Sequence, residues 1–456
     1  MNTARDINRF RGKNATVVGL ARSGAGAANL LHKIGAVVTV TDSRPEAELK
    51  EHSSRLSEGI KKVFGSHPGE LFSGADLVVV SPGVPLTIPP LMLAAESGVE
   101  MMGELELAWL YSDSPFIAVT GTNGKSTTTT LVGEMLAEAG MKVLVGGNLG
   151  NALTEEPQKL IGQDYIVAEV SSFQLEGTEG FRPKIAAILN ITQDHLDRYA
   201  GMEEYAESKA LVFRNQGPDD VLVLNADDGP TMALKDRASG RKIFFSRRRG
   251  LREGISVIEG NIVDGRVPGT RVKVLPVDEV RIKGVHNLEN ALAAAGVALA
   301  AGAPVPVVAK VLSEFPGLEH RLEFVRELGG VTYINDSKGT NVGAVEKSIE
   351  SFDSPVILIA GGLDKHSDFA PLAQLIHGRV KKMILIGKAA DVMEQALGSQ
   401  TDTARAGSLK EAVELARRSA NSGDVVLLSP ACASFDMFRD FEDRGRQFKE
   451  IVKGLA

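Results

Sequence analysis

The sequence predicts an α/β protein of three domains with mostly parallel sheets. Short apolar runs alternate with helical segments along the 456 residues, which is typical of parallel strands joined by helical crossovers. A chain of this length is expected to form roughly three domains. The alternation separates into three blocks, and we place the domains at residues 1–103, 104–317 and 318–456.

The first block opens with a strand, a glycine-rich turn, a helix and a second strand over residues 15–44. Asp42 lies at the carboxyl end of the second strand, as in a Rossmann-like domain. A dinucleotide fingerprint would need glycine at position 21, where the chain has Ala21, and its methyl group would stand close to a pyrophosphate. We therefore expect a nucleotide-like ligand other than NAD, or else a purely structural turn.

The second block contains the sequence FIAVTGTNGKSTTTT at residues 116–130. Residues 116–120 predict a short buried strand, and Gly121 and Gly124 allow the backbone N–H groups to turn toward an anion. Lys125 adds a positive charge, and Ser126 offers a hydroxyl to Mg²⁺. The common phosphate-loop pattern would need glycine where Val119 stands, but the physical requirements for a phosphate loop are met. Of the following threonines we expect most to be packed or to face the turn.

Two further strands of this block end in polar residues. One ends with Glu169, and the other is followed by Asn190, Asp194 and His195. The carboxyl ends of neighbouring parallel strands open onto one crevice, so these groups can face the phosphates of ATP. Glu169 is the predicted Mg²⁺ ligand, whereas His195 is a second-choice ligand for a hard cation and could instead orient substrate or cap a turn.

The third block begins at a hinge-like break formed by Pro316 and Gly317. Its strands are each followed by small, polar or charged residues, again at the carboxyl edge of a parallel sheet. Arg321 offers a planar cation to a γ-phosphate, and Lys338 and Lys365 could bind carboxylates. Each of these cations, taken singly, could equally be a surface charge.

Composition limits the partners and the compartment. The net charge of −7 argues against a uniformly basic surface, so we expect no nucleic-acid partner. Cys432 is the single cysteine, which excludes an intrachain disulfide and favours a reducing compartment. The charged beginning of the chain lacks a signal-peptide core. Residues 291–309 are weakly polar but contain Pro304 and Pro306, so we expect a buried helix that ends there and no membrane insertion.

Eight motifs in order carry a family resemblance: GTNGKST, EVSSFQL, NITQDHLDRY, HNLENALAA, HRLE, NDSKGTN, GGLDK and SPACASFD. Together they resemble the Mur ligase family, and in particular its D-glutamate-adding members, over nearly the whole chain. The phosphate loop of that family is G-T-x-G-K-[ST], so Val119 is no departure. The resemblance implies three α/β domains: a Rossmann-like N-terminal domain, a central phosphate-loop domain and a Rossmann-like C-terminal domain.

The resemblance also implies an activity. The chain is expected to be an ADP-forming ligase that joins D-glutamate to UDP-N-acetylmuramoyl-L-alanine through an acyl phosphate, for peptidoglycan synthesis in the bacterial cytoplasm. Its partners would be these two small molecules and ATP, with Mg²⁺, in two ions, as cofactor. We expect a monomer.

The resemblance assigns roles to residues of this sequence. The expected catalytic residues are Lys125, Glu169, His195 and Lys209. The expected ATP site comprises Gly121, Thr122, Asn123, Gly124, Lys125, Ser126, Thr127, Asn287, Asn290, Arg321 and Asp336. The expected metal ligands are Ser126, Glu169, His195 and Lys209, the last as a carbamate formed with CO₂.

The substrate residues fall into three groups. The UDP group is Gly19, Leu20, Ala21, Arg22, Ser23, Asp42, Ser43, Arg44, Ser81, Pro82 and Gly83. Asn148 and His195 would lie near the muramoyl-alanine end. The D-glutamate group is Lys338, Thr340, Lys365, Ser434 and Phe441.

Three alternatives remain on the residues alone. A ligase like folylpolyglutamate synthase shares the loop and the chemistry, although the nucleotide pocket of the first block argues against it. A phosphate-loop ATPase without ligase activity and an NAD-dependent dehydrogenase belong to other classes. Release of ADP that depends on an acceptor amine would exclude the last two.

Overall fold

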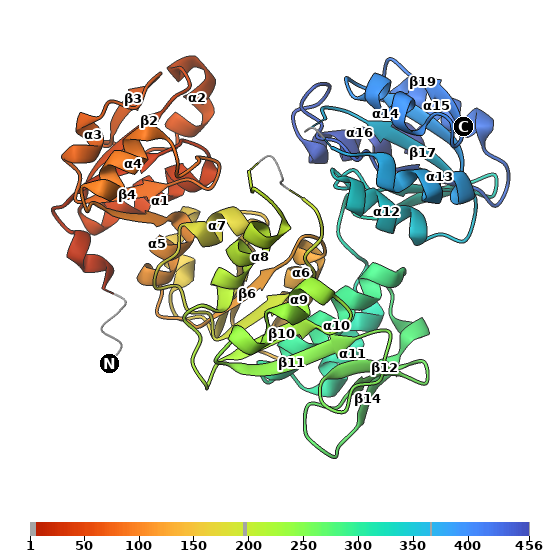
Figure 1. The fold of residues 1–456 in the computed structure, drawn as a ribbon, viewed down its shortest axis with the longest axis horizontal. Helices are drawn as coiled ribbons and strands as arrows, with labels where there is room; N and C mark the ends of the chain where they lie inside the picture. The colour runs from red at the N-terminus through yellow and green to blue at the C-terminus, as the bar shows by residue number, and fades with distance from the viewer. Residues whose placement is uncertain (1–5, 195–197, 365–366, 456) are drawn as a thin grey trace. The chain divides into compact units, whose positions relative to one another are not determined.

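The computed structural model describes residues 6–194, 198–364 and 367–455. These described residues form three sheets, and each predicted domain range contains one of them (Figure 1). Their strands are mostly parallel, which confirms the predicted α/β class. The chain divides into two compact units, one of Met1–Ile191, Glu203–Pro276 and Ala291–Val311 and one of Thr192–Met202, Val277–Asn290 and Leu312–Ala456. The three domain ranges themselves stay a prediction.

The first sheet has the strand order β3-β2-β1-β4-β5, and all its pairs are parallel. Its strands are β1 (Asn14–Val18), β2 (Val37–Asp42), β3 (Lys61–Phe64), β4 (Leu77–Val80) and β5 (Glu100–Gly103). The helices of this range are α1 (Arg22–Ile34), α2 (Glu46–Ser53), α3 (Glu70–Ser73) and α4 (Pro89–Glu96). The chain order reverses between β1 and β4, and ligands bind at such a switch point in doubly wound sheets.

The second sheet has nine strands in the order β14-β13-β12-β11-β10-β9-β6-β8-β7. The strands are β6 (Phe116–Thr120), β7 (Val143–Gly147), β8 (Tyr165–Glu169), β9 (Ile185–Ile188), β10 (Val221–Asn225), β11 (Arg241–Ser246), β12 (Ile255–Ile258), β13 (Asn261–Asp264) and β14 (Val272–Pro276). Only the pairs that involve β13 are antiparallel. All residues of β6 are buried, as expected for a strand covered on both faces.

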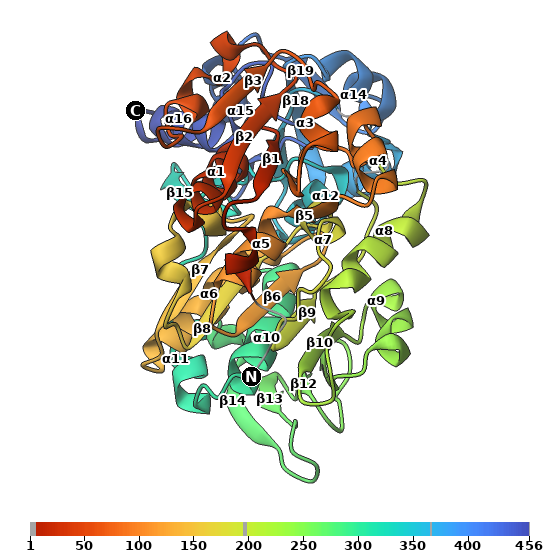
Figure 2. The same cartoon turned by 90° about the vertical axis from the view of Figure 1, so that its left-hand side faces the viewer.

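The predicted central range also contains helices. They are α5 (Glu104–Tyr111), α6 (Lys125–Glu138), α7 (Ser172–Glu176), α8 (Met202–Ala210), α9 (Gly229–Ala233), α10 (Val285–Ala300) and α11 (Val305–Glu314). Helix α6 packs on β6, β7 and β8 (Figure 2). The phosphate loop therefore connects β6, an interior strand of the sheet, to a helix that the same sheet supports.

The third sheet has the order β15-β16-β20-β17-β18-β19, with only β15 antiparallel. Its strands are β15 (Glu323–Leu328), β16 (Val331–Asn335), β17 (Val356–Gly361), β18 (Val380–Ile386), β19 (Asp402–Arg405) and β20 (Val425–Leu428). Its helices are α12 (Val342–Glu350), α13 (Ala373–Arg379), α14 (Ala390–Leu397), α15 (Leu409–Ser419) and α16 (Phe441–Lys453). Two apolar clusters fill its core, one including Leu358 and Met383 and the other including Val426 and Phe448.

One detail of the sequence analysis was wrong. The stretch 291–309 is not one helix and its exit, because a second helix, α11, begins at Val305. Pro304 and Pro306 lie at the start of α11, where proline is tolerated because the first N–H groups of a helix lack partners inside it. Thr127, Thr128 and Thr129 are packed as expected, and they lie inside α6.

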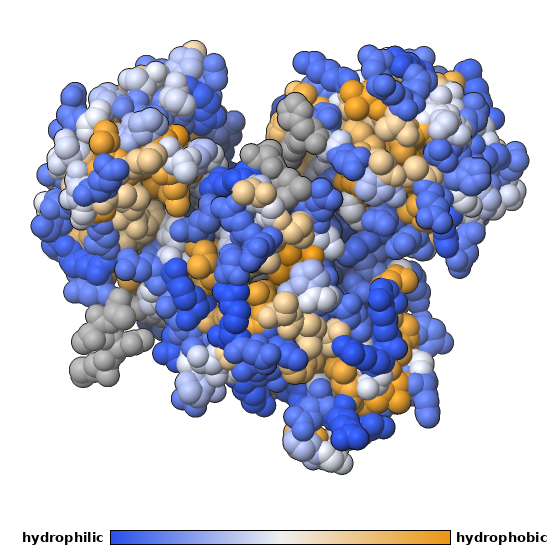
Figure 3. Space-filling view, in the orientation of Figure 1, coloured by the Kyte–Doolittle hydropathy of each residue, from blue (hydrophilic) through white to orange (hydrophobic). Residues whose placement is uncertain are grey.

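The apolar strand residues lie between the layers, and hydrophilic side chains predominate in the view of Figure 3, with hydrophobic ones interspersed among them. Of the helices in the described part of the chain, none combines the length and the apolar character needed to cross a bilayer.

Candidate active site

The turn from β6 into α6 forms a phosphate-loop cradle. Gly121 has φ +148° and Gly124 has φ +88°, both in the region that favours glycine. A Cβ atom at Gly121 would lie 3.0 Å from the Cβ of Leu189. Because Gly124 precedes the first turn of α6, the N–H groups of that turn face the loop. The backbone that the sequence predicts for anion binding is therefore present.

Asn190 holds the loop in place. Its Oδ1 accepts a hydrogen bond from the Asn123 N–H at 2.9 Å, and its Nδ2 donates to the Asn123 carbonyl at 3.0 Å. The carbonyl of Asn190 also accepts from the Thr122 N–H at 2.9 Å. One residue at the end of β9 thus fixes two consecutive loop residues. The sequence analysis placed Asn190 at this strand end but gave it no role.

Two lysines meet at the carbonyl of Gly121. Lys125 Nζ donates to it at 2.9 Å and to the Thr122 carbonyl at 2.8 Å. Lys209 Nζ, from α8, donates to the same oxygen at 3.1 Å and lies 4.3 Å from the ring centroid of Tyr205. Lys209 is only 1% exposed, so its ammonium group is almost fully desolvated. The structure therefore brings together two predicted catalytic residues that are far apart in sequence.

Glu169 and Asn148 meet at the adjoining strand ends. Glu169, at the end of β8, is buried, and its Oε1 accepts from Asn148 Nδ2 at 2.7 Å. The backbone holds the same pair, because the Asn148 N–H donates to the Glu169 carbonyl at 3.0 Å. Gly147 allows this approach, since a Cβ there would lie 2.5 Å from that carbonyl oxygen. Ser126 is buried near the start of α6. His195 lies outside the described residues.

The first domain builds a second turn around Asp42. Its carboxylate accepts from the Leu20 N–H at 2.7 Å and from two nitrogens of Arg44, Nε at 3.0 Å and Nη2 at 2.8 Å. Burial would raise the pKa of Asp42, but these hydrogen bonds outweigh it and hold the pKa below its usual value. Asp42 is therefore an ionised anchor of the turn.

The same turn is closed from β4. Ser81 Oγ donates to the Gly19 carbonyl at 2.8 Å, and a Cβ atom at Gly24 would lie 2.0 Å from that oxygen. Helix α1 can therefore approach β1 only with glycine at position 24. The other predicted UDP residues around the turn are half-buried or exposed: Ala21, Arg22, Ser23, Ser43, Arg44, Pro82 and Gly83.

Asp336 is enclosed at the end of β16. Its Oδ2 accepts from the hydroxyls of Ser348 and Ser429, each at 2.7 Å, and its Oδ1 accepts from the Leu322 N–H at 3.2 Å. Burial raises the pKa of Asp336, against the hydrogen bonds of the two serines, which lower it. The contacts of Asp336 thus fix the chain next to Arg321.

Asn287 and Asn290 lie one turn apart on α10, and both are buried. Asn287 Nδ2 donates to the Lys283 carbonyl at 2.8 Å. Before them, burial and the charges of Arg321 and Lys347 lower the pKa of His286 to about 3, so this imidazole is neutral near pH 7. Three residues of the HNLEN motif thus present uncharged polar groups.

Four of the predicted D-glutamate residues lie in the described segments that follow strands at the carboxyl edge of the third sheet. Lys338 Nζ lies 5.3 Å from the ring centroid of Phe441, and Thr340 follows two residues after Lys338. Ser434 is buried in the loop after β20. Lys365 lies outside the described residues.

Arg444 braces these loops, and the sequence analysis missed it. It is completely buried, and it donates from Nε to Ser337 Oγ at 2.9 Å and from Nη2 to the Ser337 carbonyl at 2.8 Å. Both of its Nη atoms also lie 3.3 Å from the Cys432 carbonyl. No sequence pattern marks this arginine among the charged residues of α16.

Comparison with known proteins decides the family. The model described as "Mur ligase MurD-like, N-terminal domain" matches residues 13–103, "Mur ligase middle domain" matches 119–298, and "Mur ligase, glutamate ligase domain" matches 320–432. The chain is 48% identical over 452 residues to the UDP-N-acetylmuramoylalanine--D-glutamate ligase of Pelotomaculum thermopropionicum, covering 98% of this chain and 99% of that protein. The chain belongs to the Mur ligase family.

A second relative and two solved structures agree with this Mur ligase assignment. The protein of the same name from Geotalea daltonii is 47% identical over 98% of both chains. A pseudomurein peptide ligase type C from Methanothermus fervidus has a TM-score of 0.63 at 19% identity, covering 97% of this chain and all of that one. UDP-N-acetylmuramate-alanine ligase MurC from Thermotoga maritima has a TM-score of 0.60 at 20% identity, covering 97% and 99%. At these identities, the structures establish the fold alone.

The Mur ligase fold thus brings together two sets of predicted residues within the first compact unit: the phosphate loop with Lys209, and Glu169 with Asn148. In the second unit it brings Lys338 to Phe441 and Asp336 to the segment that carries Arg321. The roles of these residues stay predictions.

Proposed function

We propose that this Mur ligase joins D-glutamate to UDP-N-acetylmuramoyl-L-alanine and converts ATP to ADP and phosphate. The observation that carries the proposal is the 48% identity over 98% of the chain to a protein named for that product. The cradle between β6 and α6 supports the ATP-dependent part.

The chemistry explains why ATP is required. A carboxylate does not condense with an amine in water, so the γ-phosphoryl group of ATP is first transferred to an oxygen of the alanyl carboxylate. The amine of D-glutamate then attacks the carbonyl carbon, the C–N bond forms, and the C–O bond to phosphate breaks as the amine loses its proton. The protein contributes mainly by positioning the reactants and by neutralising charge.

The loop fits a nucleotide phosphate. Lys125 is held beside the loop by two carbonyls, so its charge lies where phosphate oxygens would enter. Thr127 Oγ1 is buried, and it has no hydrogen-bond partner among the described residues. A ligand oxygen would satisfy it. We assign the phosphates to Gly121–Thr127 and the adenine to Asn287 and Asn290.

The oxygen ligands fit Mg²⁺. Ser126 and Glu169 would supply a hydroxyl and a carboxylate, which are donors that a hard cation prefers. When bound, Mg²⁺ would offset the negative charge of the phosphates. His195 stays a predicted ligand.

Lys209 is the residue that we propose to be carbamoylated. Lys209 is 1% exposed, and a lysine amine in its neutral form adds to CO₂. The product is a carboxylate that could help to hold a second Mg²⁺. Its place beside Gly121 supports this role.

We assign UDP to the turn around Asp42, where Arg44 and the N–H groups at the start of α1 face the switch point of the sheet. D-glutamate is assigned to Lys338, Thr340, Lys365, Ser434 and Phe441, because its two carboxylates need cations and hydroxyls while its amine stays available. Asn148 would lie near the alanyl carboxylate.

The test is ADP release with ATP, Mg²⁺, UDP-N-acetylmuramoyl-L-alanine and one acceptor from a panel of D-glutamate, L-glutamate, L-lysine and meso-diaminopimelate. We expect D-glutamate to be the fastest acceptor and background release without any acceptor to be negligible. A faster second acceptor would overturn the specificity. ADP release that is independent of the acceptor would overturn the ligase assignment. The monomeric state and the bacterial cytoplasmic location stay predictions.

A further inference from the structure

The residues on both sides of Arg321 have an unusual backbone conformation. His320 has φ +64° and Leu322 has φ +44°. Both angles lie in the left-handed region that residues other than glycine rarely adopt. Each such residue costs about 1 to 3 kcal/mol and persists only where its surroundings enforce it. Glu259 and Ala431 are the other non-glycine residues with positive φ in the described part of the chain, so two of four such residues flank one arginine.

A notch in α16 holds the ring of His320. The imidazole is buried, and a Cβ atom at Gly445 would lie 2.2 Å from its Nδ1. The ring of Phe441 packs edge-on against it, with centroids 6.3 Å apart. Glycine inside a helix costs about 1 kcal/mol relative to alanine. The position of the His320 ring explains why glycine is found here, because any larger residue at position 445 would collide with the ring.

Polar contacts fix the orientation of the ring and the backbone of His320. Asn335 Nδ2 donates to His320 Nδ1 at 2.9 Å, which assigns Nδ1 as the acceptor of a neutral imidazole. Glu323 Oε2 accepts from the His320 N–H and from Asn335 Nδ2, both at 2.9 Å. The same carboxylate therefore holds both the backbone of His320 and the side chain that orients its ring.

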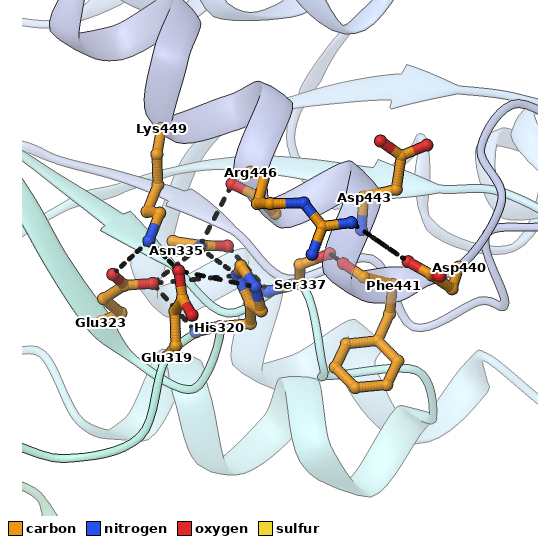
Figure 4. A network of polar contacts seen from close by, with 11 residues as sticks. Glu319, His320, Glu323, Asn335, Ser337, Asp440, Phe441, Asp443, Arg446 and Lys449 are labelled. Carbon is orange, nitrogen blue, oxygen red and sulfur yellow. Dashed lines mark hydrogen bonds and ion pairs between the residues drawn. The ribbon is translucent and has the colours of Figure 1, made fainter. Parts of the chain in front are cut away.

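Lys449 completes the clamp. Figure 4 shows it reaching from α16 to both Glu319 and Glu323, and its Nζ lies 2.9 Å from Glu323 Oε1. Glu319, His320 and Glu323 are close enough to suggest a metal site. The ammonium group of Lys449 already binds both carboxylates, so the cluster acts as a clamp on the backbone.

The other side of Arg321 is also fixed. The Leu322 N–H donates to Asp336 Oδ1 at 3.2 Å, and Ser348 and Ser429 hold the second oxygen of Asp336. Arg321 itself is different, because its Nε is buried and has no hydrogen-bond partner among the described residues. Both neighbours of Arg321 are anchored, while its side chain keeps a donor for a ligand.

We propose that His320 and Gly445 are positioning residues, which present the guanidinium of Arg321 to the transferring phosphate of ATP. Asn335, Glu323 and Lys449 hold the ring of His320 in its notch for this purpose. The proposal rests on the ATP-dependent ligase function above. A cation that is fixed before the reaction neutralises developing charge without reorganisation, whereas a shift of about 1 Å can cost roughly 100-fold in rate.

The test is Gly445→Ala, which adds one methyl group against His320 and changes no charge. We expect kcat to fall about 10- to 100-fold, while the KM for UDP-N-acetylmuramoyl-L-alanine changes less than twofold. Gly454→Ala at the end of the same helix is the matched control, because its Cβ would meet only atoms at 3.4 Å or more. The control should keep the wild-type kcat.

A double-mutant cycle separates positioning from general destabilisation. If Gly445 acts through Arg321, then Gly445→Ala should have little further effect in an Arg321→Gln background. Additive losses would overturn the proposal, and so would a Gly445→Ala enzyme with wild-type kcat.

A second pair of variants covers the case in which Gly445→Ala fails to fold. His320→Gly relieves the positive φ but removes the ring, so it should fold and lose kcat. His320→Asn tolerates the same φ and keeps a polar side chain, so it should retain more activity than His320→Gly. Equal activity in these two variants and the wild type would overturn the proposal.

An NMR measurement separates this proposal from the proposed function. The Nε–H signal of Arg321, assigned by its absence in Arg321→Gln, should exchange slowly with water in the wild type. It should shift and exchange faster in Gly445→Ala. An unchanged signal would overturn the positioning role. A wild-type protein without acceptor-dependent ADP release would refute the proposed function, while the NMR result would still decide whether Gly445 positions Arg321.

Discussion

In the proposed function, the phosphate loop and the segment around Arg321 each present a cation to a phosphate of ATP, but they use opposite backbone strategies. The loop has Gly121 and Gly124 at positive φ, which glycine adopts without steric strain. The Arg321 segment uses His320 and Leu322 at positive φ and relies on tertiary contacts to hold them there. The positive φ angles of the loop are encoded locally by its glycines, whereas those beside Arg321 depend on residues far along the chain.

This difference predicts different consequences of mutation. In the loop, the largest losses should come from the functional side chains themselves. In the Arg321 segment, losses should come also from residues that never meet the substrate, such as Gly445. The following predictions sharpen this contrast, in order of decreasing effect.

Lys125→Ala should lower kcat about 1,000-fold or more, because it removes a charge that matters most during phosphoryl transfer. Circular dichroism and the unfolding midpoint should stay close to the wild type, since the hydrogen bonds of Lys125 to the Gly121 and Thr122 carbonyls lie within the loop itself. Steady-state ADP release measures the effect. A loss of less than about tenfold would show that the loop is not catalytic.

Lys209→Ala should lower kcat roughly 100-fold, because a carboxylate derived from Lys209 would no longer be available to bind Mg²⁺. Short carboxylic acids such as acetate should restore part of the activity by entering the space of the missing side chain. Lys235→Ala is the control, because it removes a half-buried lysine from the segment whose Arg237 bonds Glu207 of α8. Full activity of Lys209→Ala without added acid would end the carbamate proposal.

Asn190→Ala should lower kcat/KM for ATP about tenfold and destabilise the protein by about 2 to 3 kcal/mol. It removes both side-chain hydrogen bonds to Asn123 and leaves a loop N–H without its partner. Denaturant unfolding and ATP-dependent kinetics measure the two effects. Asn8→Ala, at an exposed position, should change neither quantity. An equal effect of both variants would contradict the role of Asn190 in holding the phosphate loop.

His286 should make stability depend on pH. Its pKa of about 3 in the folded protein lies below the usual value of 6.5, so the folded state disfavours the charged form. The contribution of the neutral His286 to the free energy of unfolding is therefore fully present above pH 6.5. It is lost as the pH falls toward 3, because the unfolded state then binds the proton more readily than the folded state. Between pH 7 and pH 5 the loss should be at most about 2 kcal/mol.

The control for this effect is His286→Gln, whose unfolding free energy should fall less over the same pH interval. Urea unfolding followed at both pH values measures it. An identical pH dependence in the wild type and the variant would contradict the assigned pKa.

The two regions also mark the limit of sequence analysis. The strand at residues 116–120, the loop and the helix after it were predicted because periodicity, glycines and the lysine lie within one short stretch. Asp42 and Glu169 were predicted at strand ends by the same reasoning. The side-chain clamp of Asn190 could not be predicted, because it depends on the pairing of β9 with β6.

In the third sheet the missing information is tertiary. Nothing in HRLE indicates positive φ at His320, and α16 lies more than 100 residues away in the sequence. Gly445 inside an otherwise helical stretch was the available signal, since such a glycine often has a packing reason. Arg444 gave no signal, because a completely buried arginine looks like a surface charge in sequence.

The central claim is that the alanyl carboxylate is activated by phosphorylation. The most direct measurement uses UDP-N-acetylmuramoyl-L-alanine labelled with ¹⁸O in that carboxylate, with ATP, Mg²⁺ and D-glutamate. The account predicts that the released inorganic phosphate carries one ¹⁸O atom per turnover, because the C–O bond to the transferred phosphoryl group breaks when the amine attacks. Product formation with unlabelled phosphate would contradict it.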